Sequence, residues 1–189
     1  MTRAAWLVAL LALATHSAAD PAFTTSGSVA QATNKAGALG AWFADAAYFV
    51  FGFSAWWLIV VSLRAWLGAL ARVLRSEQAP VAPVDLHEPP AWLFWVGIVV
   101  LLAASCALES TRLYQFESRV AGGHAGGVLG YLLGPASQKL LGFAGSGVLW
   151  IALLVAGIAM SLRFSWLRVA ESIGTWLESF REKRAERIE

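Results

Sequence analysis

The chain has 189 residues, of which 58% are hydrophobic and only 14% are charged. A soluble domain carries roughly a quarter charged residues, and here the apolar residues gather in long blocks, which indicates an integral membrane protein. The formal net charge of +2 is too small to suggest a nucleic-acid surface, and the single cysteine, Cys106, excludes an intrachain disulfide and a cysteine metal cluster.

The first apolar block covers residues 4–19 and follows one charge, Arg3. Two interpretations stay open: a cleaved signal peptide, with small residues ahead of Asp20, or a short first transmembrane helix. A span needs about 20 residues to cross about 30 Å of hydrocarbon, and this block has sixteen. In both cases we expect the chain to emerge at Asp20 into a polar extracytoplasmic loop over residues 20–40.

The second span is predicted at residues 41–64, and its helix should continue past the membrane through Arg72. Asp45 lies at the membrane boundary. Acids embedded in a membrane are often functional, but at the end of a span we expect the carboxylate to reach water and to have a simple topological role. Four prolines between residues 80 and 90 then favour an extended linker, so that residues 65–90 form a cytoplasmic connection.

The third span is predicted at residues 91–109, and an extracytoplasmic loop follows at residues 110–139. This loop contains a glycine-rich stretch, and its candidates for partner binding or helix packing are His124, Gly126, Gly127 and Gly130. Glycine serves both uses, so both interpretations stay open. We expect a short surface helix over residues 128–133, a break at Gly134 and Pro135, and a cap on the next helix from Ser137.

The fourth span is predicted at residues 140–162 and completes a membrane domain over residues 1–163. From residue 164 to residue 189, apolar residues recur at three- and four-residue spacing among charged ones. This pattern is typical of an amphipathic helix on the membrane interface. Its apolar face would include Trp166, Ile173, Trp176 and Phe180.

The basic residues predict the orientation of the spans. With the N-terminus inside, ten Lys and Arg residues lie on the cytoplasmic side and four lie outside. The prediction is therefore an all-α integral membrane protein with four transmembrane helices, both termini cytoplasmic, and a C-terminal cytoplasmic amphipathic helix.

The search for catalytic chemistry gives no candidate. The glycine run lacks the Lys and the hydroxyl residue of a phosphate-binding loop, and the three histidines fall in separate places. Ser54 and Ser105 lie within spans, but no strong base is evident beside them. We therefore expect no enzyme activity, catalytic residue, cofactor or metal in this segment. A transporter would need ionisable residues near the middle of its spans, and they are scarce.

Several short motifs, in order, resemble the N-terminal membrane domain of the bacterial cell-division DNA translocases of the FtsK/SpoIIIE family. They begin with Asp20, Pro21 and Phe23 and continue with GAWFAD at 40–45, FGFSAWW at 51–57, HAGGVLG at 124–130, LLGFAG at 140–145 and SWL at 165–167. The resemblance runs from near residue 20 to near residue 175. The resemblance adds Asp20, Pro21 and Asp45 to the candidate residues for partner binding or helix packing.

The resemblance implies a membrane anchor and assembly module at the division septum of the bacterial inner membrane. It implies three kinds of partner: other division proteins, membrane lipids and further copies of the chain, which would form a hexamer. It implies no DNA contact from this segment. A linker and an ATP- and Mg²⁺-dependent motor would normally follow, and a cytoplasmic leader would precede the first span. The alternative is a small self-contained four-span protein such as a transporter subunit.

Overall fold

The computed structural model describes residues 3–28, 31–76, 90–115, 125–162 and 174–176. Within these ranges the named elements are all helices. They are α1 (Arg3–Ala14), α2 (Gly37–Phe51), the short 3-10 helix η1 (Gly52–Ala55), α3 (Trp56–Ser76), α4 (Ala91–Arg112) and α5 (Gly127–Ser161). The predicted all-α class is confirmed.

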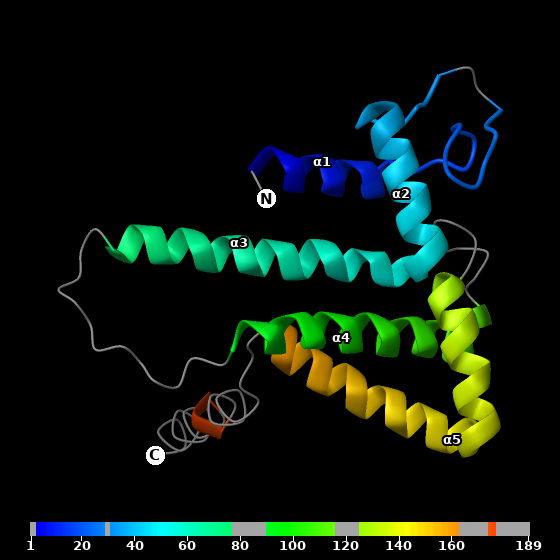
Figure 1. Cartoon of the computed structure of the whole chain (residues 1–189), viewed down its shortest axis with the longest axis vertical. Helices are drawn as coiled ribbons and strands as arrows, with labels where there is room; N and C mark the ends of the chain where they lie inside the picture. Colours follow the sequence, from blue (N-terminus) through cyan, green and yellow to red (C-terminus); the bar gives the residue numbers. More distant parts are fainter. Residues whose placement is uncertain (1–2, 29–30, 77–89, 116–124, 163–173, 177–189) are drawn as a thin grey trace, which may run out of the picture.

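Four helical stretches run along one direction: α1, α3, α4 and the last part of α5 (Figure 1). α3 has 21 residues and α4 has 22, so at about 1.5 Å per residue each matches a hydrocarbon layer of about 30 Å. Residues 37–71, 91–112 and 127–161 are each apolar and long enough to cross a membrane, and α1 contributes a shorter apolar helix. The protein is thus an integral membrane protein.

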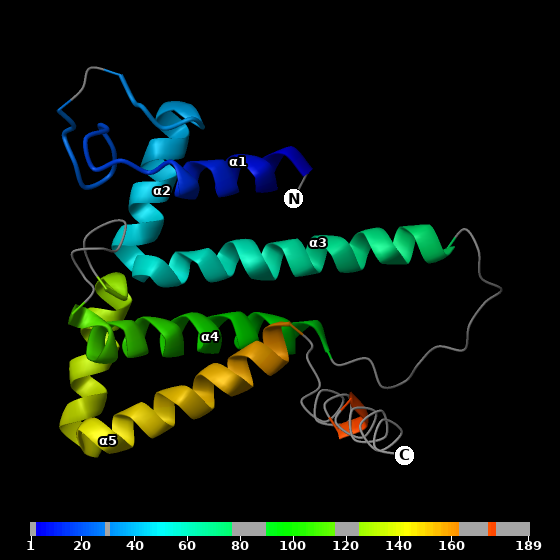
Figure 2. The same ribbon diagram turned by 180° about the vertical axis from the view of Figure 1, so that it is seen from behind.

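Two helices of similar length lie across that direction, both at the same end of the molecule (Figures 1 and 2). They are α2 and residues 127–141 of α5, which we call the two transverse helices. α2 ends where Gly52 adopts a φ of 59°, and α5 turns where Gly142 adopts φ 69° and ψ 177° inside the helix. Left-handed φ values are open to glycine without a side-chain penalty, so each glycine turns the chain into the following span.

These turns correct two predictions. Residues 41–64 are not one continuous helix, because Gly52 separates a transverse helix from α3. The break predicted at Gly134 and Pro135 is also wrong, since Pro135 lies inside the helix and the chain turns at Gly142. Ser137 caps nothing, because its hydroxyl donates within the helix to the Gly134 carbonyl at 2.8 Å.

Small residues let the last two spans approach closely. A Cβ atom at Gly157 would lie 2.7 Å from the backbone of Leu101, and one at Gly97 would lie 2.6 Å from that of Ser161. Inside a bilayer the hydrophobic effect does not drive helices together, so close van der Waals contacts between small residues stabilise their packing. The first half instead has an apolar cluster, in which Leu13, Tyr48 and Ile59 are buried together.

Candidate functional site

The loop between α1 and α2 is organised by the carboxylate of Asp20, which is 1% exposed. Its Oδ1 accepts bonds from the backbone N–H and the hydroxyl of Thr33, both at 2.7 Å, and its Oδ2 accepts from the N–H of Asn34 at 2.9 Å. The Thr33 N–H and hydroxyl hold the pKa of Asp20 below its ordinary value. Asn34 in turn donates to the Ala12 carbonyl at 2.9 Å and satisfies an open carbonyl near the end of α1.

Asp45 joins the same loop to α2. Its Oδ2 accepts from the backbone N–H of Thr24 at 2.5 Å and from the Thr24 hydroxyl at 2.8 Å. Asp45 is 5% exposed, so the expectation that its carboxylate reaches water is wrong. The bonds from Thr24 replace the water that a boundary carboxylate would otherwise need. Pro21 is half-buried and its backbone packs on Gly27.

Three of the predicted glycines form a close junction between the halves of the molecule, whereas His124 lies outside the described residues. A Cβ atom at either Gly126 or Gly130 would collide with the Cys106 carbonyl oxygen of α4. One at Gly127 would lie 2.6 Å from the Val50 carbonyl near the end of α2. The structure therefore places Gly126, Gly127 and Gly130 in backbone packing.

Glu109 completes this junction, and sequence reasoning missed it. Its Oε1 accepts from the Ser54 hydroxyl of η1, and its Oε2 accepts from the Gly126 N–H at 2.9 Å. Ser54 Oγ also lies 2.7 Å from Ser105 Oγ, which accepts from the Trp57 indole at 3.1 Å. One buried carboxylate thereby ties η1, α4 and the start of α5 together.

The serines predicted to lack a base thus do have an acid beside them. Glu109 is 6% exposed and Ser54 is 1% exposed, so the group is closed to a substrate and its bonds join helices. One signal was available in the sequence: an acid in the last turn of an apolar block, four residues after Ser105. Acids in such blocks are costly and normally have a partner.

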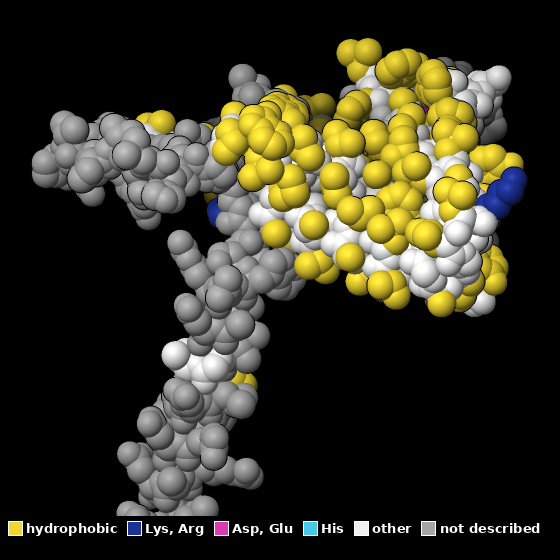
Figure 3. Space-filling view, turned by 60° about the horizontal axis from the view of Figure 1, so that its bottom comes forward, with side chains coloured by type: hydrophobic (Ala, Val, Ile, Leu, Met, Phe, Trp, Pro, Cys, Tyr) yellow, Lys and Arg dark blue, Asp and Glu magenta, His cyan; other side chains and the backbone are white. Residues whose placement is uncertain are grey.

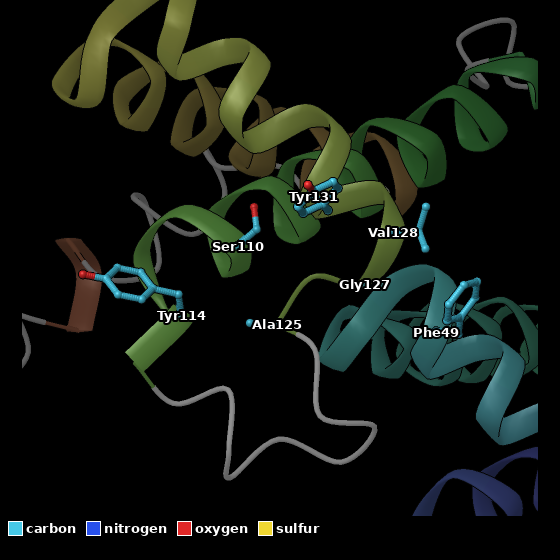
Figure 4. Close-up of a pocket in the computed structure, with 7 residues that line it drawn as sticks. All are labelled: Phe49, Ser110, Tyr114, Ala125, Gly127, Val128 and Tyr131. Atoms are coloured by element: carbon cyan, nitrogen blue, oxygen red, sulfur yellow. The ribbon is translucent and has the colours of Figure 1, made fainter. Parts of the chain in front are cut away.

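An open cavity of about 450 Å³ lies beside the junction (Figure 4). It is lined by Phe49, Ser110, Tyr114, Ala125, Gly127, Val128 and Tyr131. A second hollow of about 330 Å³ shares Ser110, Tyr114 and Tyr131 with it. Aromatic rings and hydroxyls dominate these walls, and among the described residues no cluster of three or more His, Cys, Asp or Glu side chains could hold a metal.

The predicted C-terminal amphipathic helix falls almost wholly outside the described residues, including Trp166, Ile173 and Phe180. Residues 174–176 form a described helical segment, in which Trp176 is 57% exposed. The interfacial role of this helix stays a prediction.

Comparison with known families gives one match over most of the chain. The family described as the 4TM region of DNA translocase FtsK/SpoIIIE matches residues 1–174. Among curated proteins, DNA translocase FtsK 2 of Ralstonia nicotianae is 35% identical over 171 residues, which cover 90% of this chain and 21% of that protein.

Two further relatives give the same result. DNA translocase FtsK of Pseudomonas syringae pv. syringae is 32% identical over 89% of this chain and 20% of its own length. DNA translocase FtsK of Shewanella oneidensis is 30% identical over 87% and 17%. The chain therefore spans about a fifth of the length of these relatives. No solved structure matches it.

Proposed function

Because this chain belongs to the family of the 4TM region of DNA translocase FtsK/SpoIIIE, we propose that it anchors a DNA translocase in the bacterial inner membrane and assembles it at the division site. There it would help couple chromosome segregation to cell division. The match over residues 1–174 is the observation that carries the proposal. It favours this role over that of a self-contained transporter subunit.

In this proposal the membrane segment holds and docks, and it catalyses nothing. The buried polar groups at Asp20, Asp45 and Glu109 all bond to the chain itself, which supports a structural role for them. ATP and Mg²⁺ would act in the motor of the relatives rather than here, and DNA would not contact this segment.

The arrangement of the spans supports cytoplasmic termini. The start of α1, the end of α3, the start of α4 and the end of α5 all point away from the transverse helices (Figure 1). Arg64 lies toward that end and donates to the Leu162 carbonyl at 3.1 Å. Lys35, Arg112 and Lys139 lie near the opposite end. This distribution agrees with basic residues remaining in the cytosol.

The outer loop, residues 20–28 and 31–36, is the surface that we propose for division partners. Asp20 and Asp45 fix its backbone from within, while Ser26, Gln31 and Lys35 remain exposed. A loop that is already ordered loses less conformational entropy when a partner binds. Copies of the chain would be brought together as a hexamer, as the resemblance implies.

The experiment that tests this role follows septal recruitment of a full-length translocase carrying this membrane segment and a fluorescent tag. Ser26→Arg and Gln31→Arg, made separately and together, alter the exposed outer loop without touching its internal bonds. Ala71→Arg, at the exposed cytoplasmic end of α3, is the control matched to each single variant. We expect the outer pair to abolish the midcell band at unchanged protein level and the control to keep it. Equal recruitment of all variants would remove the loop from the partner surface.

A second measurement tests the orientation. A reporter that is active only outside the cytosol is inserted after Gly27 in one fusion and after Glu189 in another. We expect activity from the first fusion alone. Activity from the second would invert the topology and with it the proposed anchoring of a cytosolic motor.

A further inference from the structure

Residues 37–53 and residues 127–143 are related to each other by a constant shift of 90 positions. The first stretch reads GALGAWFADAAYFVFGF and the second GVLGYLLGPASQKLLGF, so six of seventeen positions are identical, three of them glycines. The identical pairs are Gly37 and Gly127, Leu39 and Leu129, Gly40 and Gly130, Ala46 and Ala136, Gly52 and Gly142, and Phe53 and Phe143.

The backbone repeats at the same shift. Each stretch starts at a glycine with positive φ, 73° at Gly37 and 56° at Gly127. Each then forms a helix of fifteen residues and ends at a second such glycine, Gly52 at 59° or Gly142 at 69°. In both halves the transverse helix follows an apolar helix, α1 or α4, and leads into another, α3 or the last part of α5 (Figure 1). Sequence and backbone therefore agree on a duplicated unit.

The two transverse helices also bury equivalent faces. The buried positions one turn apart are Gly40, Ala44 and Ala47 in α2 and Gly130, Gly134 and Ser137 in α5. The large apolar side chains point outward: Trp42 is 54% exposed and its counterpart Leu132 is 61% exposed. A helix on a water-facing surface does the opposite, with its apolar stripe inward.

We infer that α2 and residues 127–141 are two copies of one element that lies in the membrane plane, immersed among the acyl chains of the outer leaflet. The small faces pack on the protein and the large apolar faces contact lipid. Their exposed surface continues onto the next span, where Phe143, Val148 and Ile151 are 63%, 70% and 55% exposed. Hydrophobic side chains are spread widely over this side of the molecule (Figure 3).

This immersion moves the boundary with water outward. Residues 127–138, predicted as part of an extracytoplasmic loop, would lie in lipid. The exposed Lys139 would extend its apolar stem along this surface and place its ammonium group at the boundary with water. Water would otherwise meet mainly the connections that follow α1 and α4. The inference rests on the proposed orientation with both termini in the cytosol, but not on a role at the division site, so the two can fail separately.

The test places a nitroxide spin label at matched positions in the full chain reconstituted in nanodiscs. Trp42→Cys and Leu132→Cys form one pair, Phe53→Cys and Phe143→Cys form a second, and Ser26→Cys is the water-facing control. The parent protein serves as a blank, since Cys106 is 0% exposed. Collision with oxygen, which concentrates in lipid, is compared with collision with a water-soluble nickel complex.

We expect the collision rate with oxygen to exceed that with nickel several-fold at both members of each pair, as for side chains within the acyl region, and the reverse at Ser26→Cys. Nickel access at the paired positions would overturn immersion. Oxygen access at one member of a pair only would overturn the equivalence of the two copies. Exclusion of both reagents would show that a second copy or a partner protein covers these faces instead of lipid.

Discussion

In the first half of the molecule, residues 3–76, polar side chains from a loop hold the transverse helix in place. Asp45 of α2 bonds to Thr24, and the Tyr48 hydroxyl donates to the Leu13 carbonyl at 3.0 Å. In the second half, residues 90–162, the equivalent helix lies directly on α4, where Gly130 and Gly134 leave no room for a side chain. Hydrogen bonds from a loop thus contribute more to holding the transverse helix in the first half, and close backbone packing contributes more in the second half.

This difference indicates that the element itself is specified by its terminal glycines and not by one set of contacts. At the centre of the molecule, a Cβ atom at Gly52 would lie 2.5 Å from the N atom of Gly126. At the outer extremes, a Cβ atom at Gly37 or Gly142 would meet nothing within 4 Å. Each crowded glycine therefore has an uncrowded counterpart 90 positions away, which serves as its control.

The largest effect is expected for Gly52→Ala and Gly127→Ala. Each would add the cost of a positive-φ backbone conformation that other residues rarely adopt, about 1–3 kcal/mol, to an overpacking cost of about 1–3 kcal/mol against neighbouring backbone. Their counterparts Gly142→Ala and Gly37→Ala should lose only the first amount. Thermal unfolding of the four purified variants, followed by tryptophan fluorescence, checks the ranking. Equal losses of stability for a crowded glycine and its counterpart would mean that the central junction is packed less closely than its geometry indicates.

The next effect is expected for Glu109→Ala, which leaves the Gly126 N–H without its acceptor, while the Ser54 hydroxyl can still donate to Ser105 Oγ. One unsatisfied buried polar group costs about 1–3 kcal/mol, so the free energy of unfolding should fall by about that amount. Glu109→Gln keeps one acceptor oxygen, so its free energy of unfolding should fall by less than that of Glu109→Ala. The same unfolding assay measures both variants, and a neutral Glu109→Ala would show that the junction does not depend on this carboxylate.

The spans could be predicted from the sequence because the signal is the mean hydropathy of a window of residues. Each apolar residue in residues 91–112 raises that mean. The transverse helices could not be predicted in this way, because they are as apolar as the spans. Their residues raise the mean hydropathy equally, and nothing in that mean shows where the chain turns. Gly142 is one of several glycines in an apolar block, and its immediate sequence does not distinguish it from packing glycines such as Gly157, whereas its φ of 69° does.

The candidate site was likewise predictable only in part. Asp20, Asp45 and the glycines were identified by their positions in the motifs of a family, but their roles depend on partners distant in sequence. The bond from Thr24 to Asp45 spans 21 residues, and that from Ser54 to Glu109 spans 55. No local pattern carries such pairings. The shift of 90 positions between the two transverse helices, by contrast, was visible in the sequence and would have predicted the turn at Gly142 from that at Gly52.

A smaller effect is expected where each half fastens its transverse helix to the following span through an indole. Trp150 donates to the Ser137 hydroxyl at 2.8 Å, and Trp56 donates to the Tyr48 hydroxyl at 3.1 Å. Ser137→Ala should cost about 1 kcal/mol, the net contribution of one hydrogen bond. Tyr48→Phe should cost more, because the Tyr48 hydroxyl also donates to the Leu13 carbonyl of another helix, whereas the second bond of Ser137 stays within its own helix. The reverse order in thermal unfolding would contradict the stronger role of polar bonds in the first half.

The smallest effect is confined to the outer loop and depends on pH. Because the pKa of Asp20 is lowered by folding, its ionised form stabilises the loop above the ordinary value of 3.8, and this contribution is lost as the pH falls through the folded value. Amide hydrogen exchange at Thr33 and Asn34, whose N–H groups bond to Asp20, should therefore show constant protection from neutral pH down to about 4 and a loss below it. Asp20→Asn should exchange faster at every pH with no such step, while amides in the middle of α4 serve as the reference. A step that survives in Asp20→Asn would assign the pH dependence to another group and leave the loop of the first half held by Asp45 alone.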